Sequence, residues 1–314
     1  MKNIPVIAVE KETIAEAYEA ALIELYNRGC RFKTQYDKPE DPESIDATMN
    51  ITVLNPLKDP MIHKAFPGGI EDLREYVMEL QGVKNHWCKN INDPEDKRWE
   101  YTYNQRFSAY GSWKEKHDIV DSEENVIGHK EIDVGFKVDQ IAYCIEKLIK
   151  QPFTRQAQMI TWMPNLDLNI FDPPCLQNLW FRMAEENGEY WLNTNIRFRS
   201  NDSWGAFFMN FFGLTIFIKE KIADVIAERT GKKVNLGRIN WQADSWHIYG
   251  KDIKQAKERL FDRIDKTKFE DRVYNFYDPD IQEMYNEATP IIEEKIRVET
   301  KKMEEQARKS TTHD

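Results

Sequence analysis

A cysteine and a polar cluster suited to an anion lie close together near the middle of the chain. Cys175 follows two prolines and precedes an apolar run that is typical of a strand, and a second strand pattern ends in Arg199-Ser200-Asn201-Asp202. The planar guanidinium fork and the hydroxyl suit a phosphate group. A nearby arginine also lowers the pKa of a thiol. These residues indicate a nucleophilic cysteine that faces a phosphate-bearing substrate; an inert buried cysteine and a surface salt bridge are the alternatives.

Other polar side chains could complete such a site. In His247-Ile248-Tyr249 the two polar rings lie on the same side if the segment is extended, where both could hydrogen-bond a sugar hydroxyl. A lone histidine is more often structural. Glu71, Glu75 and Glu79 are spaced by four residues and line one face of a predicted helix, where a solvated surface is the alternative for any one of them.

The composition excludes several classes of protein. The 314 residues carry a net charge of −10, which argues against a nucleic-acid partner, and 41% are hydrophobic, enough for a substantial core. The chain has no apolar run of 18 residues, so we expect no membrane span, and its beginning lacks the apolar core of a signal peptide. The four cysteines lie far apart without a CxxC pair, which predicts reduced thiols in the cytoplasm.

Nucleotide-triphosphate, dinucleotide and zinc-protease motifs are missing, and we expect no metal site. Apolar periodicity and turn residues predict a single α+β domain with a sizeable mixed sheet and a long, buried central helix. Helices are expected at 13–28, 70–81, 136–150, 204–229, 251–263 and 280–308. Strands are expected at 47–57, 155–162, 178–184, 190–198 and 234–241, and 99–107 alternates like a strand or a pocket lining. Residues 1–45 and 280–314 are expected to form helical extensions of the domain.

Taken together, these residues resemble thymidylate synthase and its relatives, the pyrimidine nucleotide hydroxymethylases. The resemblance covers residues 70–252, and its motifs fall in the family's order, which makes the joint match specific. Pro174-Cys175 resembles the nucleophile loop, and 199–202 resembles the family's Arg-Ser-x-Asp segment. The remaining matches are Glu75, Tyr103, Arg155, Asn210, Trp241, His247 and Tyr249.

The resemblance implies a catalytic role for three residues. Cys175 would add to C6 of a pyrimidine nucleoside monophosphate, so that C5 attacks the one-carbon unit of 5,10-methylenetetrahydrofolate. Glu75 would shuttle protons through ordered water, and Tyr103 would help to remove the C5 proton.

The resemblance also implies binding roles and an assembly. Asn210 would read the pyrimidine edge, and Asp202 would contact the pterin. The phosphate would be held by Arg199, Ser200 and an Arg155 that reaches across a sheet-to-sheet homodimer. The 3′-hydroxyl would be held by His247 and Tyr249.

Departures from the synthase pattern favour hydroxymethylation of a uridylate-type nucleotide (dUMP). Leu176 replaces the histidine that usually follows the cysteine, Gln156 replaces a second arginine, and Ser245 replaces an aspartate. The polar tail at 304–314 is unlike the short apolar tail that closes synthases, so water should enter. Asn210 favours uracil. The alternatives are a thymidylate synthase, a dCMP or CMP hydroxymethylase, a catalytically silent nucleotide- or RNA-binding relative, and an unrelated cysteine hydrolase.

Overall fold

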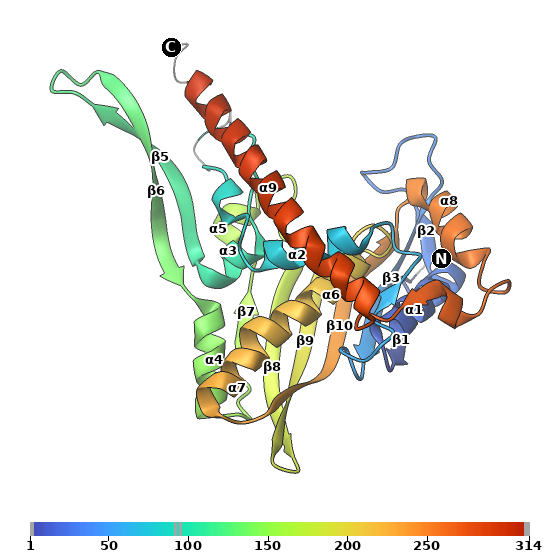
Figure 1. The fold of residues 1–314 in the computed structure, drawn as a ribbon. Helices are drawn as coiled ribbons and strands as arrows, with labels where there is room; N and C mark the ends of the chain where they lie inside the picture. Colours follow the sequence, from blue (N-terminus) through green and yellow to red (C-terminus); the bar gives the residue numbers. More distant parts are fainter. Residues whose placement is uncertain (1–2, 91–92, 94–95, 311–314) are drawn as a thin grey trace.

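A mixed seven-stranded sheet organises the part of the chain that the structure describes (Figure 1). The structure is a computed structural model that describes residues 3–90, 93 and 96–310, so residues 311–314 of the predicted polar tail at 304–314 lie outside the described residues. The strand order is β1-β3-β10-β9-β8-β7, with β2 paired to the start of β3. The β1–β3 and β9–β10 pairs are parallel and the others antiparallel. The predicted α+β class with a large mixed sheet is confirmed.

The elements follow one another along the chain with these bounds. The strands are β1 (Val6–Lys11), β2 (Cys30–Phe32), β3 (Ser44–Val53), β4 (Ile62–His63), β5 (Tyr110–Val120), β6 (Val126–Val138), β7 (Gln158–Ile160), β8 (Leu176–Glu186), β9 (Glu189–Asp202), β10 (Val234–Ile248) and β11 (Val273–Tyr274). The helices are α1 (Ile14–Arg28), α2 (Ile70–Leu80), α3 (Tyr103–Ser108), α4 (Gln140–Lys150), α5 (Pro164–Asp167), α6 (Phe207–Ile218), α7 (Asp224–Thr230), α8 (Ile253–Ala256) and α9 (Pro279–Ser310).

Helix α6 is the buried central helix that the sequence predicts. It is apolar around almost its whole circumference, which fits a helix that is covered on all sides. Its phenylalanines stack on the aromatic side chains of the sheet, where the Phe211 and Trp241 ring centres lie 5.2 Å apart. A π-helical turn, Lys219–Ala223, joins α6 to α7, and Gly231 ends the run in a left-handed conformation that glycine accepts readily.

The opposite face of the sheet is polar. Side chains that alternate with the core residues on β8, β9 and β10 line a shallow hollow there, among them Asn178, Trp180, Asn195, Arg197 and Gln242. In strands, successive side chains point to opposite faces, so one face packs on α6 while the other presents amides, an indole and a guanidinium. The predicted sheet-to-sheet homodimer would use this face.

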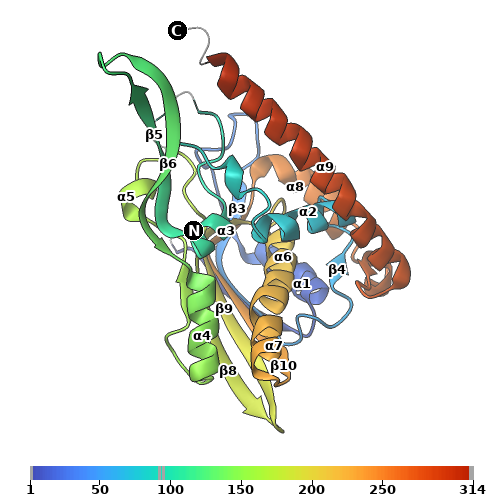
Figure 2. The same ribbon diagram turned by 60° about the vertical axis from the view of Figure 1, so that its left-hand side comes forward.

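Two elements extend from the body of the molecule (Figure 1, Figure 2). The β5–β6 hairpin projects away from the main sheet in both views, and α9 crosses α2 and continues outward. Within the described residues, no helix combines the length and the apolar character that a membrane crossing requires.

The structure differs from the sequence-based expectation in three segments. The second half of 99–107 is helical and not a strand, because Thr102 caps the start of α3 by accepting a hydrogen bond from the backbone N–H of Gln105, 3.0 Å away. The alternative, a pocket lining, holds for Glu100, Gln105 and Arg106, which line a cavity. Residues 110–138 form the β5–β6 hairpin, which replaces the predicted helix start at 136. The N-terminal 45 residues contain α1 but also β1 and β2, which pair into the main sheet.

Candidate active site

Arg199 on β9 holds the loop that carries Cys175. The Arg199 backbone N–H donates to the Cys175 carbonyl at 2.9 Å, and its Nε donates to the Pro174 carbonyl at 3.1 Å. Its Nη2 donates to the Pro173 carbonyl. Burial raises the pKa of the Cys175 thiol, and the Arg199 charge opposes this only in part. Arg199 therefore lowers the pKa of the thiol, as the sequence predicts, but burial outweighs its charge and the pKa stays above the ordinary value.

Tyr103 lies beside the cysteine loop. Its hydroxyl accepts a hydrogen bond from the backbone N–H of Leu176, the residue after Cys175, at 3.3 Å. Burial raises the pKa of Tyr103, and the nearby Cys175 raises it further, so the hydroxyl stays protonated at neutral pH. The structure therefore brings together Cys175, Arg199 and Tyr103, as the sequence predicts.

Asn210 on α6 contacts two polar side chains. Its Oδ1 accepts from Asn201 Nδ2 at 3.0 Å, and its Nδ2 donates to the Tyr76 hydroxyl at 2.7 Å, with the amide atoms assigned from this network. Tyr76, which lies next to Glu75 on α2, was not among the site residues predicted from the sequence. Gly213 makes room for it, because a Cβ at this position would lie 2.5 Å from the Tyr76 ring.

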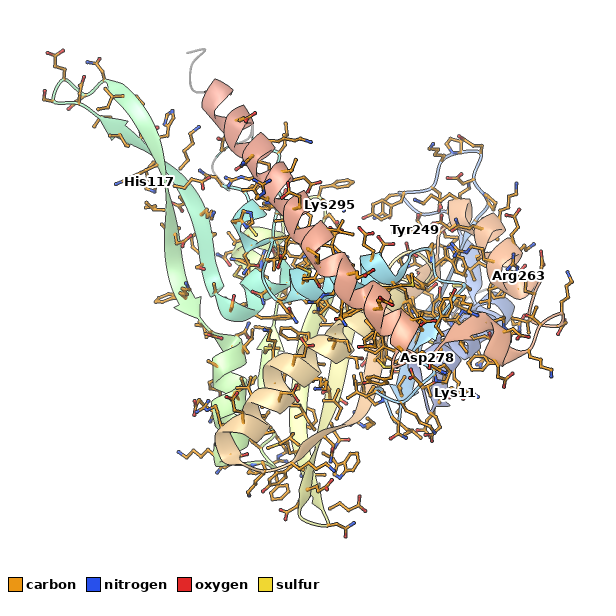
Figure 3. All side chains as sticks on the ribbon, viewed as in Figure 1. Lys11, His117, Tyr249, Arg263, Asp278 and Lys295 are labelled. Carbon is orange, nitrogen blue, oxygen red and sulfur yellow. The ribbon has the colours of Figure 1, made fainter. Side chains whose placement is uncertain are left out.

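Glu75 lies in a charged cluster instead of contacting the cysteine loop directly. Its carboxylate binds Lys84 Nζ and Lys295 Nζ, each at 2.7 Å, and Lys295 comes from α9 (Figure 3). Burial alone would raise the pKa of Glu75, but hydrogen bonds from Lys295 and Lys84 lower it. Glu79 shares Lys84 at 3.3 Å, yet burial raises its pKa. The pKa of Glu75 is therefore lower than the ordinary value of a glutamate, and the pKa of Glu79 is higher.

The parallel pairing of β9 with β10 gathers the residues predicted to bind phosphate, sugar and pterin. Ser200 pairs with Ser245, and Asp202 pairs with His247. The Tyr249 ring lies edge-on to His247, with ring centres 4.6 Å apart. His247 is buried and contacts Ser245, which in turn contacts Asp46 on β3. Asp46 was not predicted as part of the site. The available signal was Ser245, which stands where the synthase pattern has an aspartate.

Asp202 occupies the turn that leads into α6. Its Oδ1 accepts the backbone N–H groups of Trp204 and Gly205 at 3.0 and 2.9 Å. Burial raises the pKa of its carboxyl, and the two backbone donors oppose the rise. A Cβ at Gly205 would lie 2.5 Å from Oδ2, so the glycine leaves space at that oxygen. A carboxyl with an accessible oxygen suits a ligand that presents N–H donors, as a pterin does.

Arg155 precedes β7 and is the residue predicted to act across a dimer interface. Its side chain is exposed, and its carbonyl accepts a hydrogen bond from the Trp180 indole at 3.1 Å. Trp180 belongs to the polar face of the sheet, opposite α6. The predicted role of Arg155 on a partner subunit stays a prediction.

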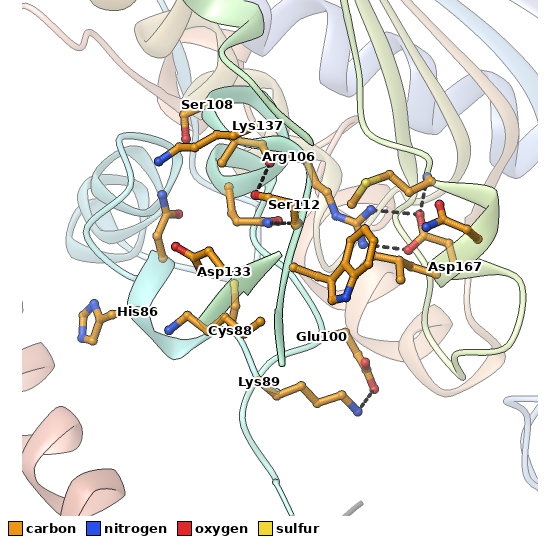
Figure 4. A pocket seen from close by; sticks show the side chains of 18 of the residues that line it. His86, Cys88, Lys89, Glu100, Arg106, Ser108, Ser112, Asp133, Lys137 and Asp167 are labelled. Carbon is orange, nitrogen blue, oxygen red and sulfur yellow. Dashed lines mark hydrogen bonds and ion pairs between the residues drawn. The ribbon is translucent and has the colours of Figure 1, made fainter. Parts of the chain in front are cut away.

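A separate cavity of about 650 Å³ lies between α3, the base of the β5–β6 hairpin and α5 (Figure 4). A buried ion pair between Arg106 and Asp167, 2.7 Å apart, contributes to its wall. The described residues that line it include none of the predicted site residues. The cavity is therefore distinct from the cysteine site.

Comparisons with known proteins bear on the family and the fold of the chain. The family model described as thymidylate synthase matches residues 73–286. Proteins named "Putative thymidylate synthase" from Methanocaldococcus jannaschii and Methanosarcina barkeri are each 28% identical, over 83% and 78% of this chain and 95% and 90% of their own lengths. The solved structure of thermostable thymidylate synthase A from Bacillus subtilis matches with a TM-score of 0.52 and 19% identity, over 79% of this chain and 84% of that one, which shows a shared fold. The resemblance inferred from the motifs is confirmed.

Proposed function

Because this chain belongs to the thymidylate synthase family of one-carbon transferases, we propose that it hydroxymethylates C5 of a uridylate-type nucleotide with methylenetetrahydrofolate. The observation that supports this most directly is the position of Arg199, which holds the Cys175 loop while its strand aligns Ser200 and Asp202 with Ser245 and His247. One strand thus connects the nucleophile to the groups that suit a phosphate and a sugar.

In the proposed reaction, Cys175 adds as a thiolate to C6 of the base. Since burial raises the pKa of its thiol, the proton must leave as the nucleotide binds. Asn210 presents its amide to the pyrimidine edge, and its contacts with Tyr76 and Asn201 hold that amide in place. The Tyr103 hydroxyl, which contacts the residue after Cys175, would assist removal of the C5 proton.

The folate cosubstrate fits the acidic turn before α6. Asp202 would hold the pterin through its free oxygen, beside the space left by Gly205. When bound, methylenetetrahydrofolate supplies the one-carbon unit.

The charged cluster on α2 supports the hydroxymethyl product. The Glu75 and Glu79 side chains keep 17% and 20% of their surface exposed, so water reaches them. Lys84 and Lys295 keep Glu75 ionised, which suits a base that orients water. Thymidylate synthesis is the second candidate, supported by the names of the relatives in methanogenic archaea.

The test is mass spectrometry of the products formed from dUMP, dCMP and CMP with methylenetetrahydrofolate. We expect dUMP to gain one formaldehyde unit with release of tetrahydrofolate. A gain of one methylene with release of dihydrofolate would mean a thymidylate synthase. Consumption of dCMP or CMP instead of dUMP would mean that the substrate base is cytosine. Cys175→Ala should abolish turnover and the covalent complex with 5-fluoro-dUMP. If no nucleotide reacts and no such complex forms in the unmodified protein, the proposal fails, and a binding role takes its place.

We also propose that the active form is a homodimer through the polar sheet face. The support is the exposed side chain of Arg155, whose backbone carbonyl accepts a hydrogen bond from the indole of Trp180 on that face. Arg155→Ala and Cys175→Ala should each be inactive, and mixing the two after partial unfolding should restore activity in heterodimers that hold one intact site. A fully active monomer by sedimentation would contradict this arrangement.

A further inference from the structure

The chain leaves the regular strand ladder directly after Cys175. From Leu176 to Asn178 the partner strand β9 advances by only one residue, so Gln177 is an extra residue and forms a β-bulge at the start of β8. A bulge bends its strand, changes the direction of nearby side chains and disrupts the ladder locally. Buried backbone groups need hydrogen bonds, so groups outside the ladder have to bind this segment.

Other elements hold the two peptide groups that follow Cys175. The Cys175 carbonyl accepts a hydrogen bond from the backbone N–H of Arg199 at 2.9 Å. In the same peptide group, the N–H of Leu176 donates to the Tyr103 hydroxyl at 3.3 Å. In the next peptide group, the Leu176 carbonyl accepts a hydrogen bond from Oγ1 of Thr161. Because each peptide group is planar, these contacts fix the direction of the backbone at the nucleophile.

Thr161 directly follows β7 and is in turn bound by a buried ion pair. Arg106 Nη1 donates to the Thr161 carbonyl at 3.3 Å. The same guanidinium binds the Asp167 carboxylate at 2.7 and 3.2 Å, and the two charged side chains are only 3% and 0% exposed (Figure 4). Asp167 Oδ2 also accepts the backbone N–H of Met163 at 2.7 Å. The segment that carries Thr161 is therefore bound to both members of the pair.

Hydrogen bonds, more than packing, hold this pair in place. The cavity of about 650 Å³ is lined by Arg106, Asp167 and Met163, so side-chain packing is incomplete on that side. A buried ion pair contributes little net stability compared with apolar side chains of similar volume, but a bidentate pair fixes the guanidinium in one orientation. Arg106 lies one turn after Tyr103 on α3, so one short helix acts on both peptide groups after the nucleophile.

We propose that Thr161, oriented by the Arg106–Asp167 pair, is a positioning residue that directs the Cys175 thiol towards C6 of the bound base. The effect on catalysis rests on the proposed function, whereas the hold on the cysteine backbone does not. Thr161 acts through the Leu176 carbonyl and not on the reacting atoms. Without its hydroxyl, a buried carbonyl would lose its donor and the backbone beside the nucleophile could change direction. A displacement of about 1 Å at a reacting group can lower a rate by about a hundredfold.

The first experiment measures the hold on the cysteine without any substrate. Alkylation of Cys175 by iodoacetamide is followed by mass spectrometry over a range of pH. Burial raises the pKa of this thiol. In Thr161→Val, which removes the hydroxyl, we therefore expect a lower apparent pKa and a reaction at pH 8 that is roughly threefold faster or more. Thr161→Ser keeps the hydroxyl and should match the unmodified protein.

The matched control is Thr215→Val. Thr215 is as fully buried as Thr161, and its hydroxyl donates to the Phe211 carbonyl at 2.8 Å within α6, so its alkylation profile should be unchanged. Arg106→Lys should shift the profile in the same direction as Thr161→Val, because an ammonium lacks the planar fork that binds Asp167. Equal profiles in Thr161→Val and the unmodified protein overturn the proposal. Unfolding would be detected by alkylation of the buried cysteines Cys30, Cys88 and Cys144.

The second experiment measures the reaction. Thr161→Val should form the covalent complex with 5-fluoro-dUMP and methylenetetrahydrofolate roughly tenfold more slowly or worse and lower kcat similarly, while KM for the nucleotide changes by less than about threefold. Thr161→Ser should recover most of the rate, and Thr215→Val should keep it. A normal rate in Thr161→Val, or an equal loss in Thr215→Val, overturns the proposal. If the unmodified protein neither turns over a nucleotide nor forms the complex, the proposed function fails, while the alkylation profiles still decide whether Thr161 holds the cysteine.

Discussion

A buried ion network anchors the segment that leads into α9. The Glu19 carboxylate on α1 accepts two hydrogen bonds from Arg272, at 2.7 and 2.8 Å, and contacts His63 Nε2 at 2.9 Å. The three side chains are at most 12% exposed. Arg272 directly precedes β11, which pairs with β4, and α9 follows soon after. Glu19→Gln would leave the guanidinium without its carboxylate.

The expected loss of stability follows from the titration of Glu19. Burial alone would raise its pKa, but His63 and Arg272 lower it from the ordinary 4.5 to about 2. At about 1.4 kcal/mol per pH unit, this corresponds to about 3 kcal/mol of folding free energy at pH 7. Because the pKa is lowered in the folded state, the contribution is complete above pH 4.5 and disappears as the pH falls through about 2.

Urea unfolding at several pH values measures this contribution. We expect Glu19→Gln to lower the free energy of unfolding by about 3 kcal/mol at pH 7 and by less than half of that near pH 3. Glu24→Gln on the same helix is the control, because its pair with Arg28 is 2.7 Å long but exposed, and it should cost less than about 0.5 kcal/mol. A loss from Glu19→Gln that is independent of pH, or no larger than the control, would refute the reasoning.

Two further predictions concern the site. Lys295→Met should let the pKa of Glu75 rise towards its ordinary value, so the acid limb of the pH profile of kcat/KM should move to higher pH. Lys254→Met is the control, because this lysine is exposed and pairs with Glu258 instead of Glu75, and it should leave the profile unchanged. Tyr76→Phe should reduce the preference for dUMP over dCMP by about fivefold, because the Asn210 amide loses one of the contacts that orient it. An unchanged dUMP/dCMP ratio of kcat/KM would count against this role of the tyrosine.

Local sequence signals predicted the elements whose pattern is strong. α1 begins where Thr13 and Glu16 form a reciprocal capping box, and α6 is apolar along its length. The β5–β6 hairpin was missed because most of its side chains are at least partly exposed on both faces, so neither strand shows a clean apolar alternation. Its charged residues resemble a loop when the sequence is considered alone.

The site was predictable where its residues follow one another along a motif. Cys175 directly precedes β8 and the 199–202 cluster ends β9, and these two strands form the predicted hairpin, so their meeting could be expected. Tyr76, Asp46 and Lys295 could not be found in this way, because their partners come from elements more than 100 residues away. Such contacts depend on how α2, β3 and α9 pack, which periodicity does not specify.

The two carboxylates on α2 connect the fold to the proposed chemistry. Lys84 is 5% exposed and binds both Glu75 and Glu79. Its single positive charge is therefore shared between two carboxylates. Lys295 adds a second cation to Glu75 only, and α9 thereby makes the pair unequal. Lys295 and Lys84 lower the pKa of Glu75, while burial raises the pKa of Glu79, so Glu79 is the one of the two that takes up a proton first as the pH falls. An ionised base and a proton carrier side by side, both reached by water, are what addition of water to a one-carbon unit on C5 requires.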